Sequence, residues 1–274
     1  MAARIWPEIT GTTSIIALLA DPIDHVRAQV ALNDRLGAAG VDAVVVPLHV
    51  PADGLRATVE TMRRADNVVG LLATIPHKQA IAALCDELGP NATVVGSANA
   101  VRVGDGRAVG EVFDGVGLVA AAAANGLRPR GKRVLVAGIG GAGSAVAAAV
   151  ANDDPAELVL ANRTASKAEA LAATLAAHCP TRVGPASAAG HDLIINCTSL
   201  GLDPDDPLPI DLLGLSPGAG VIDIIANPEW TELRRRADAA GHPTMGGAPM
   251  IDHQLGAIVD FLFSGALVSE VVRG

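Results

Sequence analysis

The stretch VLVAGIGGAGSA, residues 134–145, decides the fold of this chain. It opens with a short apolar run that is typical of a buried strand, and an alanine-rich run typical of a helix follows. Between them, glycines at the spacing G-x-G-x-x-G allow a tight turn and let the backbone approach a pyrophosphate at the helix N-terminus. The stretch therefore predicts a dinucleotide-binding unit. Its predicted cofactor-binding residues are Gly138, Gly140, Gly141, Ala142 and Gly143.

The longer run 134–150 is uncharged throughout, so a membrane span is an alternative interpretation. The run is rich in glycine and alanine rather than leucine and phenylalanine. This composition favours a strand, a glycine turn and a buried helix, and we expect no membrane partner.

The strand expected next, ELVLA at 157–161, ends in the residues NRTASKA. Enzymes that use NAD usually carry an acidic residue here for the ribose hydroxyls. This chain has Arg163 instead, and a guanidinium is suited to a 2′-phosphate. We therefore expect NADP as the cofactor, bound by Asn162, Arg163, Thr164 and Lys167. In the alternative interpretation this is a solvated helix start that Thr164 caps.

A further apolar run ends in INCTSLGL at 195–202. Thr198, Ser199 and Gly201 follow the end of the predicted strand, at the sheet edge where parallel sheets bind ligands. We expect these three residues to contact the cofactor, although ordinary turn chemistry explains them equally well.

Strand-like and helical patterns alternate along the whole chain, which predicts an α/β fold with parallel sheets and helical crossovers. We place a first domain at 1–113 and a second, Rossmann-type domain at 114–246. The segment 101–112 breaks the alternation, since Gly-Asp-Gly between valine-rich flanks predicts a β-hairpin. The strands of the first domain are expected at 14–20, 42–50 and 68–74, its helices at 25–40 and 52–65, and two C-terminal helices at 249–272.

The composition excludes several classes of function. The chain has 274 residues and a net charge of −9, which argues against nucleic-acid partners because these require clustered Lys and Arg. Cys85, Cys179 and Cys197 are scattered singly, without the spacing of a metal site or a disulfide framework. The N-terminus lacks a signal-peptide pattern. We expect a cytoplasmic protein with a small-molecule substrate and no metal, and leave a homodimer open.

Lys78 poses a different question, because it follows a buried strand in the segment LLATIPHK. Taken alone, it is best interpreted as a solvent-facing helix residue, since lysines are rarely buried without a partner. Its significance comes from a series of motifs that occur in a fixed order: LLATIPHK, GSANAV, EVFDGVG, GIGGAG, NRT, NCTSLG, DIIANP and MIDHQ.

This set resembles the shikimate dehydrogenase family, whose motifs read approximately N-V-T-x-P-x-K, G-A-x-N-T, N-T-D-G-x-G, G-A-G-G-A, N-R-T, N-A-T-S-x-G, D-x-x-Y-x-P and M-L-x-x-Q. The resemblance covers nearly the whole chain in register. It implies a substrate-binding and catalytic domain at 1–113, completed by 247–274, beside an NADP domain at 114–246. The implied reaction is reversible hydride transfer between NADPH and the ring ketone of 3-dehydroshikimate or a related cyclic hydroxy acid.

By the same resemblance, Lys78 and Asp114 are the catalytic dyad. A lysine can protonate the developing alkoxide if desolvation lowers its pKa, and a nearby carboxylate fixes the ammonium's position. Thr74, Asn99 and Gln254 are implied to hold the substrate.

The chain departs from the family where the substrate carboxylate binds. Two family serines are replaced by Val26 and Ala28, and Arg27 between them is our candidate for a charged replacement. The family tyrosine that faces the substrate is replaced by Ile225. The pocket is therefore expected to be more apolar and less selective among hydroxylated analogues, which leaves the substrate open.

Other interpretations remain. Quinate or an amino analogue of shikimate is an alternative substrate. A folate-linked dehydrogenase of the same fold is disfavoured because such enzymes pair their lysine with a tyrosine, and this chain has none. A non-catalytic NADP-binding or regulatory module is supported only by the altered carboxylate pocket.

Overall fold

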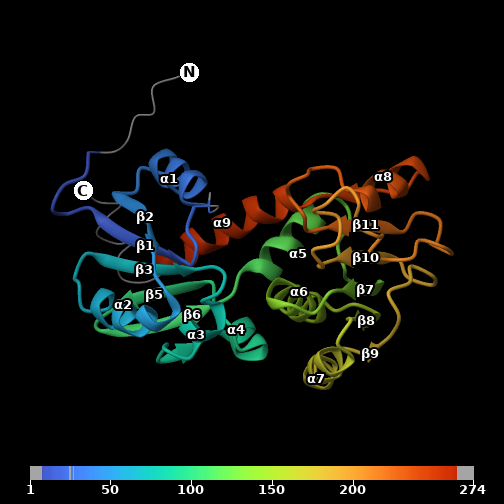
Figure 1. The fold of residues 1–274 in the computed structure, drawn as a ribbon, viewed down its shortest axis with the longest axis horizontal. Helices are drawn as coiled ribbons and strands as arrows, with labels where there is room; N and C mark the ends of the chain where they lie inside the picture. The colour runs from blue at the N-terminus through green and yellow to red at the C-terminus, as the bar shows by residue number, and fades with distance from the viewer. Residues whose placement is uncertain (1–7, 25, 27, 264–274) are drawn as a thin grey trace. The chain divides into compact units, whose positions relative to one another are not determined.

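The structure, a computed structural model, describes residues 8–24, 26 and 28–263. The chain forms two units, one of Met1–Val112 with Leu255–Gly274 and the other of Phe113–Gln254. Each unit has its own sheet with helices packed on it (Figure 1). This arrangement confirms the predicted α/β fold.

The first unit contains a six-stranded sheet with the strand order β2-β1-β3-β5-β6-β4. Strands β1, β2 and β3 run parallel, whereas β5 pairs antiparallel with both β3 and β6. The elements are β1 (Ser14–Ala20), α1 (Ala28–Ala38), β2 (Ala43–His49), η1 (Ala52–Gly54), α2 (Leu55–Met62), β3 (Val68–Ala73), α3 (Lys78–Ala82), β4 (Glu87–Leu88), α4 (Pro90–Val95), β5 (Ala100–Gly104) and β6 (Arg107–Glu111).

The apolar runs that predicted three strands form β1, β2 and β3, and β3 is buried throughout. Helices α2 and α3 cover one face of this sheet, where Leu55 and Ile81 join a buried cluster with Leu19 and Leu71 (Figure 1). The predicted hairpin is also confirmed as β5 and β6. Its turn residues Asp105 and Gly106 have φ values of 51° and 70°, as a type I′ turn requires.

The outer edge of β2 is closed by a side chain of α1. Asn33 Oδ1 accepts a hydrogen bond from Val45 N at 2.7 Å, and Asn33 Nδ2 donates to Val45 O at 3.1 Å. The amide thus makes both bonds that a neighbouring strand would make at Val45.

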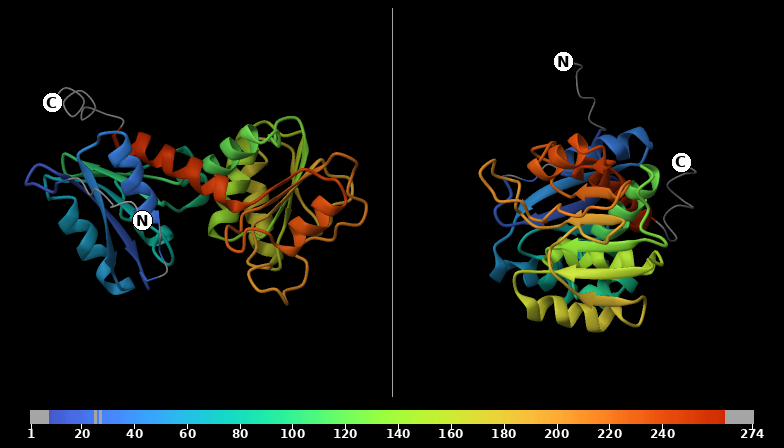
Figure 2. Two further views of the ribbon diagram at one scale, coloured as in Figure 1. Left: turned by 90° about the horizontal axis from the view of Figure 1, so that it is seen from above. Right: turned by 90° about the vertical axis from the view of Figure 1, so that its right-hand side faces the viewer.

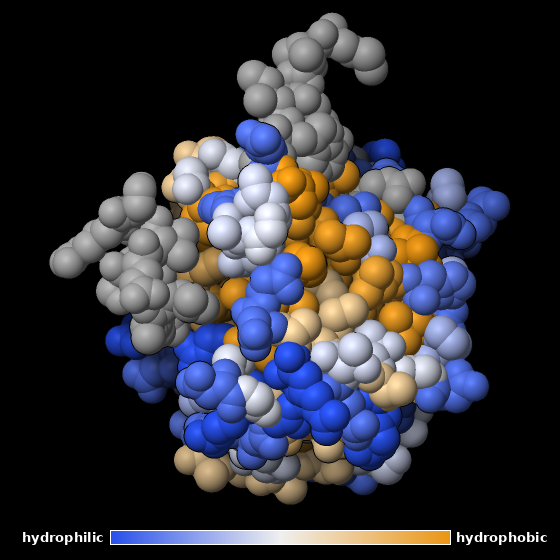
Figure 3. All heavy atoms as spheres, turned by 90° about the vertical axis from the view of Figure 1, so that its left-hand side faces the viewer, coloured by the Kyte–Doolittle hydropathy of each residue, from blue (hydrophilic) through white to orange (hydrophobic). Residues whose placement is uncertain are grey.

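Figure 3 shows that apolar residues reach the surface on the side of the first unit.

The second unit contains a six-stranded sheet with the order β12-β11-β10-β7-β8-β9, and every pair in it is parallel. The right-hand view of Figure 2 shows its strands side by side. Its elements, with the helix that continues from it into the first unit, are α5 (Asp114–Ala124), β7 (Arg133–Ala137), α6 (Gly141–Asn152), β8 (Glu157–Ala161), α7 (Ala165–Leu175), β9 (Thr181–Val183), β10 (Leu193–Asn196), β11 (Gly220–Asp223), α8 (Glu232–Ala239), β12 (Thr244–Met245) and α9 (Gly247–Phe263).

Strand β7 lies between β8 and β10, so the chain order reverses at β7. Open α/β sheets bind nucleotides at such a point, outside the carboxyl ends of the strands. The uncharged run is explained by the same structure, because β7 and α6 are almost entirely buried. None of the helices in the described part of the chain has the length and apolar character needed to cross a membrane.

Some predicted helices differ from the observed ones. The helix predicted at 52–65 is divided into η1 and α2, and the short elements β4 and α4 were not predicted. Of the predicted C-terminal helices, α9 accounts for the first, and the segment from 264 onward lies outside the described residues.

Candidate functional site

The glycine turn between β7 and α6 has the shape that a pyrophosphate requires. A side chain at Gly143 would place its Cβ 1.8 Å from Gly138 O, and Gly138 itself has a φ of 94°, so both positions need glycine. In contrast, a Cβ at Gly140 or Gly141 would meet no atom within 4 Å. The start of α6 is therefore open to a ligand while its base is closely packed, and these residues fit a dinucleotide.

Asn162 braces this turn from the end of β8. Its Oδ1 accepts a hydrogen bond from Ile139 N at 2.9 Å, and its Nδ2 donates to Thr164 O at 2.9 Å. Thr164 occupies the N-cap of α7, but its side chain makes no capping hydrogen bond. Arg163 and Lys167 are exposed beside them, and neither forms an ion pair with a described residue.

The turn after β10 carries the other predicted cofactor residues. Thr198 Oγ1 donates to Asn196 Oδ1 at 2.7 Å and accepts from Leu200 N at 3.1 Å, so this hydroxyl is used within the turn. Ser199 is exposed, and Gly201 has a φ of 113°. The last two residues are therefore compatible with a turn that offers backbone and hydroxyl groups to a ligand.

In the first unit, three predicted site residues lie together at the end of the sheet where β1 and β3 finish. Thr74 N donates to Leu19 O at 3.2 Å, which ties the end of β3 to the end of β1. Ala73 N donates to the carbonyl of Asn99, and Ala98 N donates to the carbonyl of Lys78, both at 2.9 Å. The structure therefore gathers Thr74, Lys78 and Asn99 from two separate motifs.

His77 was not among the residues predicted to act in catalysis or to bind substrate or cofactor. Its side chain is 1% exposed, and its Nε2 lies 2.8 Å from Val50 O, just after β2. Because His77 precedes Lys78, this bond anchors the start of α3 to the residue that follows β2. Its position beside Lys78 in the sequence was the only signal.

In the second unit, Asp114 is the first residue of α5 and is 6% exposed. Gln254 Nε2 donates to Asp114 Oδ1 at 2.8 Å. Helices α5 and α9 approach closely at Gly117, where a Cβ would lie 2.6 Å from Met250 O. Lys78 belongs to the first unit and Asp114 to the second.

The predicted carboxylate-binding segment is described in part. Val26 is 8% exposed, and its carbonyl accepts a hydrogen bond from Gln29 Nε2 at 3.1 Å. Arg27 lies outside the described residues. Ile225, at the family tyrosine position, is 6% exposed in the second unit.

The three cysteines are free thiols. Burial raises the pKa of Cys85 to about 11 and that of Cys179 above its usual value. Burial also raises the pKa of Cys197 strongly, and the charges of Asp223 and Asp114 add to this effect. Thiols with raised pKa values are poor nucleophiles.

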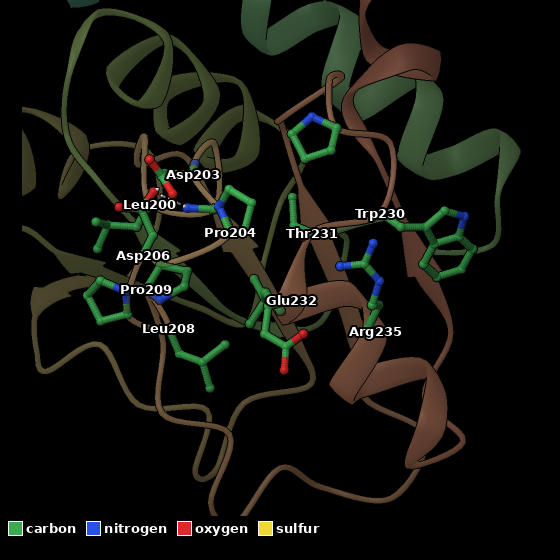
Figure 4. A pocket seen from close by; sticks show the side chains of 14 residues that line it. Leu200, Asp203, Pro204, Asp206, Leu208, Pro209, Trp230, Thr231, Glu232 and Arg235 are labelled. Atoms are coloured by element: carbon green, nitrogen blue, oxygen red, sulfur yellow. Dashed lines mark hydrogen bonds between the residues drawn. The ribbon is translucent and has the colours of Figure 1, made fainter.

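A cavity of about 290 Å³ lies next to the turn after β10, between the following loop and the start of α8 (Figure 4). Trp230, Glu232 and Arg235 line one side, and Asp203 and Asp206 line the other. Asp206 accepts hydrogen bonds from the backbone of its own loop. Of the predicted site residues that the structure describes, only Gly201 lines this cavity.

Solved structures of similar proteins cover nearly the whole chain. The 5-ketofructose reductase of Gluconobacter sp. strain CHM43 is 29% identical, with a TM-score of 0.86 over 96% of this chain and 97% of that one. The shikimate 5-dehydrogenase of Listeria monocytogenes, solved in complex with shikimate and NAD, is 26% identical, with a TM-score of 0.88 over 98% of both chains.

Sequence comparison agrees. The shikimate dehydrogenase (NADP(+)) of Rubrobacter xylanophilus is 37% identical over 256 residues, or 90% of each chain. The model of the shikimate dehydrogenase substrate binding domain matches residues 18–101, and that of shikimate / quinate 5-dehydrogenase matches residues 120–201. With its glycine turn and its cluster of motif residues in place, the chain belongs to the shikimate dehydrogenase family.

Proposed function

We propose that this chain is an NADP-dependent oxidoreductase that interconverts a ring ketone and an alcohol on a cyclic hydroxy acid such as 3-dehydroshikimate. The observation that carries the proposal is that Thr74, Lys78 and Asn99 lie together at the end of the sheet where β1 and β3 finish. These residues come from separate motifs, and they lie in the unit that matches the substrate binding domain.

In this proposal Lys78 is the proton donor. A ketone that receives a hydride at its carbon develops negative charge on its oxygen, and a lysine ammonium can protonate that oxygen. Bound NADPH supplies the hydride. The products are the alcohol, NADP⁺ and a neutral lysine amine, which regains its proton from water. Asp114 keeps the ammonium oriented. Thr74, Asn99 and Gln254 hold the substrate hydroxyls.

Selection of NADP over NAD is assigned to Arg163 and Lys167. Arg163 follows the end of β8 and Lys167 lies in the first turn of α7, and both residues are exposed. A guanidinium binds a phosphate through two parallel hydrogen bonds, and the lysine adds a second positive charge. The NADP dependence of the Rubrobacter xylanophilus relative supports this assignment.

A second substrate class, a neutral polyhydroxy ketone, is favoured by the altered carboxylate segment. Val26 is buried and Ala28 has no hydroxyl, so neither can bind a carboxylate as the family serines do. The 5-ketofructose reductase that this chain resembles is named for a ketose rather than an acid. Such a substrate would be reduced in the same way, with Lys78 as the proton donor.

The test is NADPH oxidation, followed at 340 nm with 3-dehydroshikimate and 5-ketofructose side by side. Turnover of the acid with at least about a tenfold higher kcat/KM supports the first proposal, and the reverse preference supports the second. Lys78→Ala should lower kcat by about 10²- to 10⁴-fold. Lys132→Ala is the matched control, because Lys132 lies before β7 in the other unit. Full activity of Lys78→Ala would end the assignment of the proton donor.

The cytoplasmic location and the homodimer stay predictions of the sequence. Size-exclusion chromatography with light scattering tests the homodimer directly.

A further inference from the structure

A buried polar network joins the ends of β10 and β11. Asn196 and Asp223 end these two strands, stand opposite each other in register, and are both 0% exposed. Asn196 Nδ2 donates to Asp223 Oδ1 at 3.1 Å. The same carboxylate accepts from Ile225 N at 3.1 Å and from Thr231 Oγ1 at 2.7 Å. Burial raises the pKa of Asp223, and these bonds offset part of that effect.

The side chain of Asn196 also forms hydrogen bonds with the turn that follows it. Its Oδ1 accepts from both Thr198 N, at 3.0 Å, and Thr198 Oγ1, at 2.7 Å. Its Nδ2 also lies 3.3 Å from Leu200 O. One side chain therefore shapes the turn from Cys197 to Leu200, while Asp223 fixes the orientation of that side chain.

The turn packs directly on the glycine turn. Cys197 N donates to Ala137 O at 2.7 Å. A Cβ added at Gly138 would lie 2.7 Å from Thr198 N, so no space separates the two backbones. Movement of the turn after β10 would therefore change the wall of the cofactor site.

The strand order indicates which half of the dinucleotide lies beside the turn after β10. The proposed 2′-phosphate side lies after β8, at Arg163 and at Lys167 in the first turn of α7. Strand β10 flanks β7 on the opposite side from β8. A dinucleotide that crosses the end of β7 therefore extends its nicotinamide half toward β10.

We propose that Asn196 and Asp223 are positioning residues, which hold the turn 197–200 against Gly138 and so orient the nicotinamide half of the cofactor. The inference rests on the proposed function for the identity of the cofactor. Neither residue reaches the surface, so neither touches a ligand. Asn196 acts through Thr198 and Leu200, and Asp223 acts through Asn196. A displacement of about 1 Å at such a site can lower a rate by about 10²-fold.

The experiment compares three single variants of the full chain and the double variant of Asn196 and Asp223. Asp223→Ala removes the carboxylate, and Asn196→Ala removes the link to the turn while Asp223 keeps its bonds to Ile225 and Thr231. Asp153→Ala is the matched control. Asp153 is also buried and binds Arg128 at 2.7 Å. It precedes β8, and so it lies near the amino ends of the parallel strands, whereas Asn196 and Asp223 lie at their carboxyl ends.

Two binding measurements separate the halves of the cofactor without relying on turnover. Calorimetry with adenosine 2′,5′-bisphosphate reports the 2′-phosphate side alone, and the fluorescence of bound NADPH reports the environment of the dihydronicotinamide. Asp223→Ala and Asn196→Ala should bind the bisphosphate within about twofold of the parent, yet lose most of the NADPH emission change. Their kcat should fall at least about tenfold. The double variant should lose no more than either single variant, because the two residues act as a unit.

The control should lower thermal stability with the emission change and kcat intact. Equal weakening of both ligands, or the same behaviour in Asp153→Ala, would overturn the inference and assign the network a general structural role. If Asp223→Ala does not fold, Asn196→Ala carries the same test. If the parent binds both ligands but reduces no ketone, the proposed function fails while the binding measurements still decide the role of the network.

Discussion

Gln254 Nε2 donates a hydrogen bond to Asp114 Oδ1 across 2.8 Å, although the two residues are 140 positions apart in the chain. The contact depends on the close approach of α5 and α9 at Gly117. A methyl group there would lie 2.6 Å from Met250 O and 2.7 Å from Gln254 Cβ. The absence of a side chain at Gly117 therefore determines where the amide of Gln254 meets the carboxylate.

Gly117→Ala should separate the two helices. Overpacking of this kind costs about 1–3 kcal/mol of unfolding free energy, and activity should fall because Gln254 is displaced from Asp114. Urea unfolding and the 340 nm assay measure the two effects. Gly37→Ala is the control, since a Cβ at that exposed position of α1 meets nothing within 4 Å and should be neutral or stabilising. Equal stability of parent and Gly117→Ala would contradict the packing argument.

Arg163→Glu should raise the KM for NADPH at least about tenfold, because it replaces a phosphate-binding guanidinium with a carboxylate that repels the negatively charged phosphate. The KM for NADH should change much less, since NADH has no 2′-phosphate. Steady-state kinetics with both cofactors measure the ratio. The control is Arg130→Glu, an exposed position before β7. An unchanged NADPH-to-NADH ratio in Arg163→Glu would move the phosphate site elsewhere.

His77→Phe should lower kcat and stability together. The substitution keeps a ring but leaves the carbonyl of Val50 without its donor, which costs about 1–3 kcal/mol, and it loosens the start of α3 that carries Lys78. His77→Gln retains a side-chain NH donor and should recover part of both losses. Thermal melts and kcat for the two variants provide the comparison. Identical values for them would show that the bond to Val50 contributes little.

Asp192 predicts a pH dependence of stability. Hydrogen bonds from the Arg133 side chain and backbone lower the pKa of Asp192 to about 2. A carboxyl whose pKa is lower in the folded than in the unfolded chain stabilises the fold above the unfolded value, near 4, and loses this contribution as the pH falls from about 4 to 2. Asp192→Asn should therefore be less stable than the parent at pH 6, and the difference should shrink below pH 4. A difference independent of pH in thermal melts would refute the link.

The sequence predicted the architecture well where one local pattern carried the information. Gly138 and Gly143 fixed the nucleotide turn by their spacing, and the apolar runs fixed the main strands. Contacts between residues that lie far apart in the chain escaped prediction. Nothing near Asn162 in the sequence shows that its amide bonds Ile139, and nothing near Asp223 shows that it supports Asn196, because both contacts form only when neighbouring strands are aligned.

Asn33 has a consequence for how copies of this protein can meet. Exposed sheet edges are templates for adding strands from other chains. In β2 the amide of Asn33 already occupies the outward-facing groups of Val45. Pro47, two residues on, has no N–H to offer on that same side. The first unit thus carries its own guard against edge-to-edge aggregation at β2, and any self-assembly there must use side-chain surfaces instead of a shared sheet.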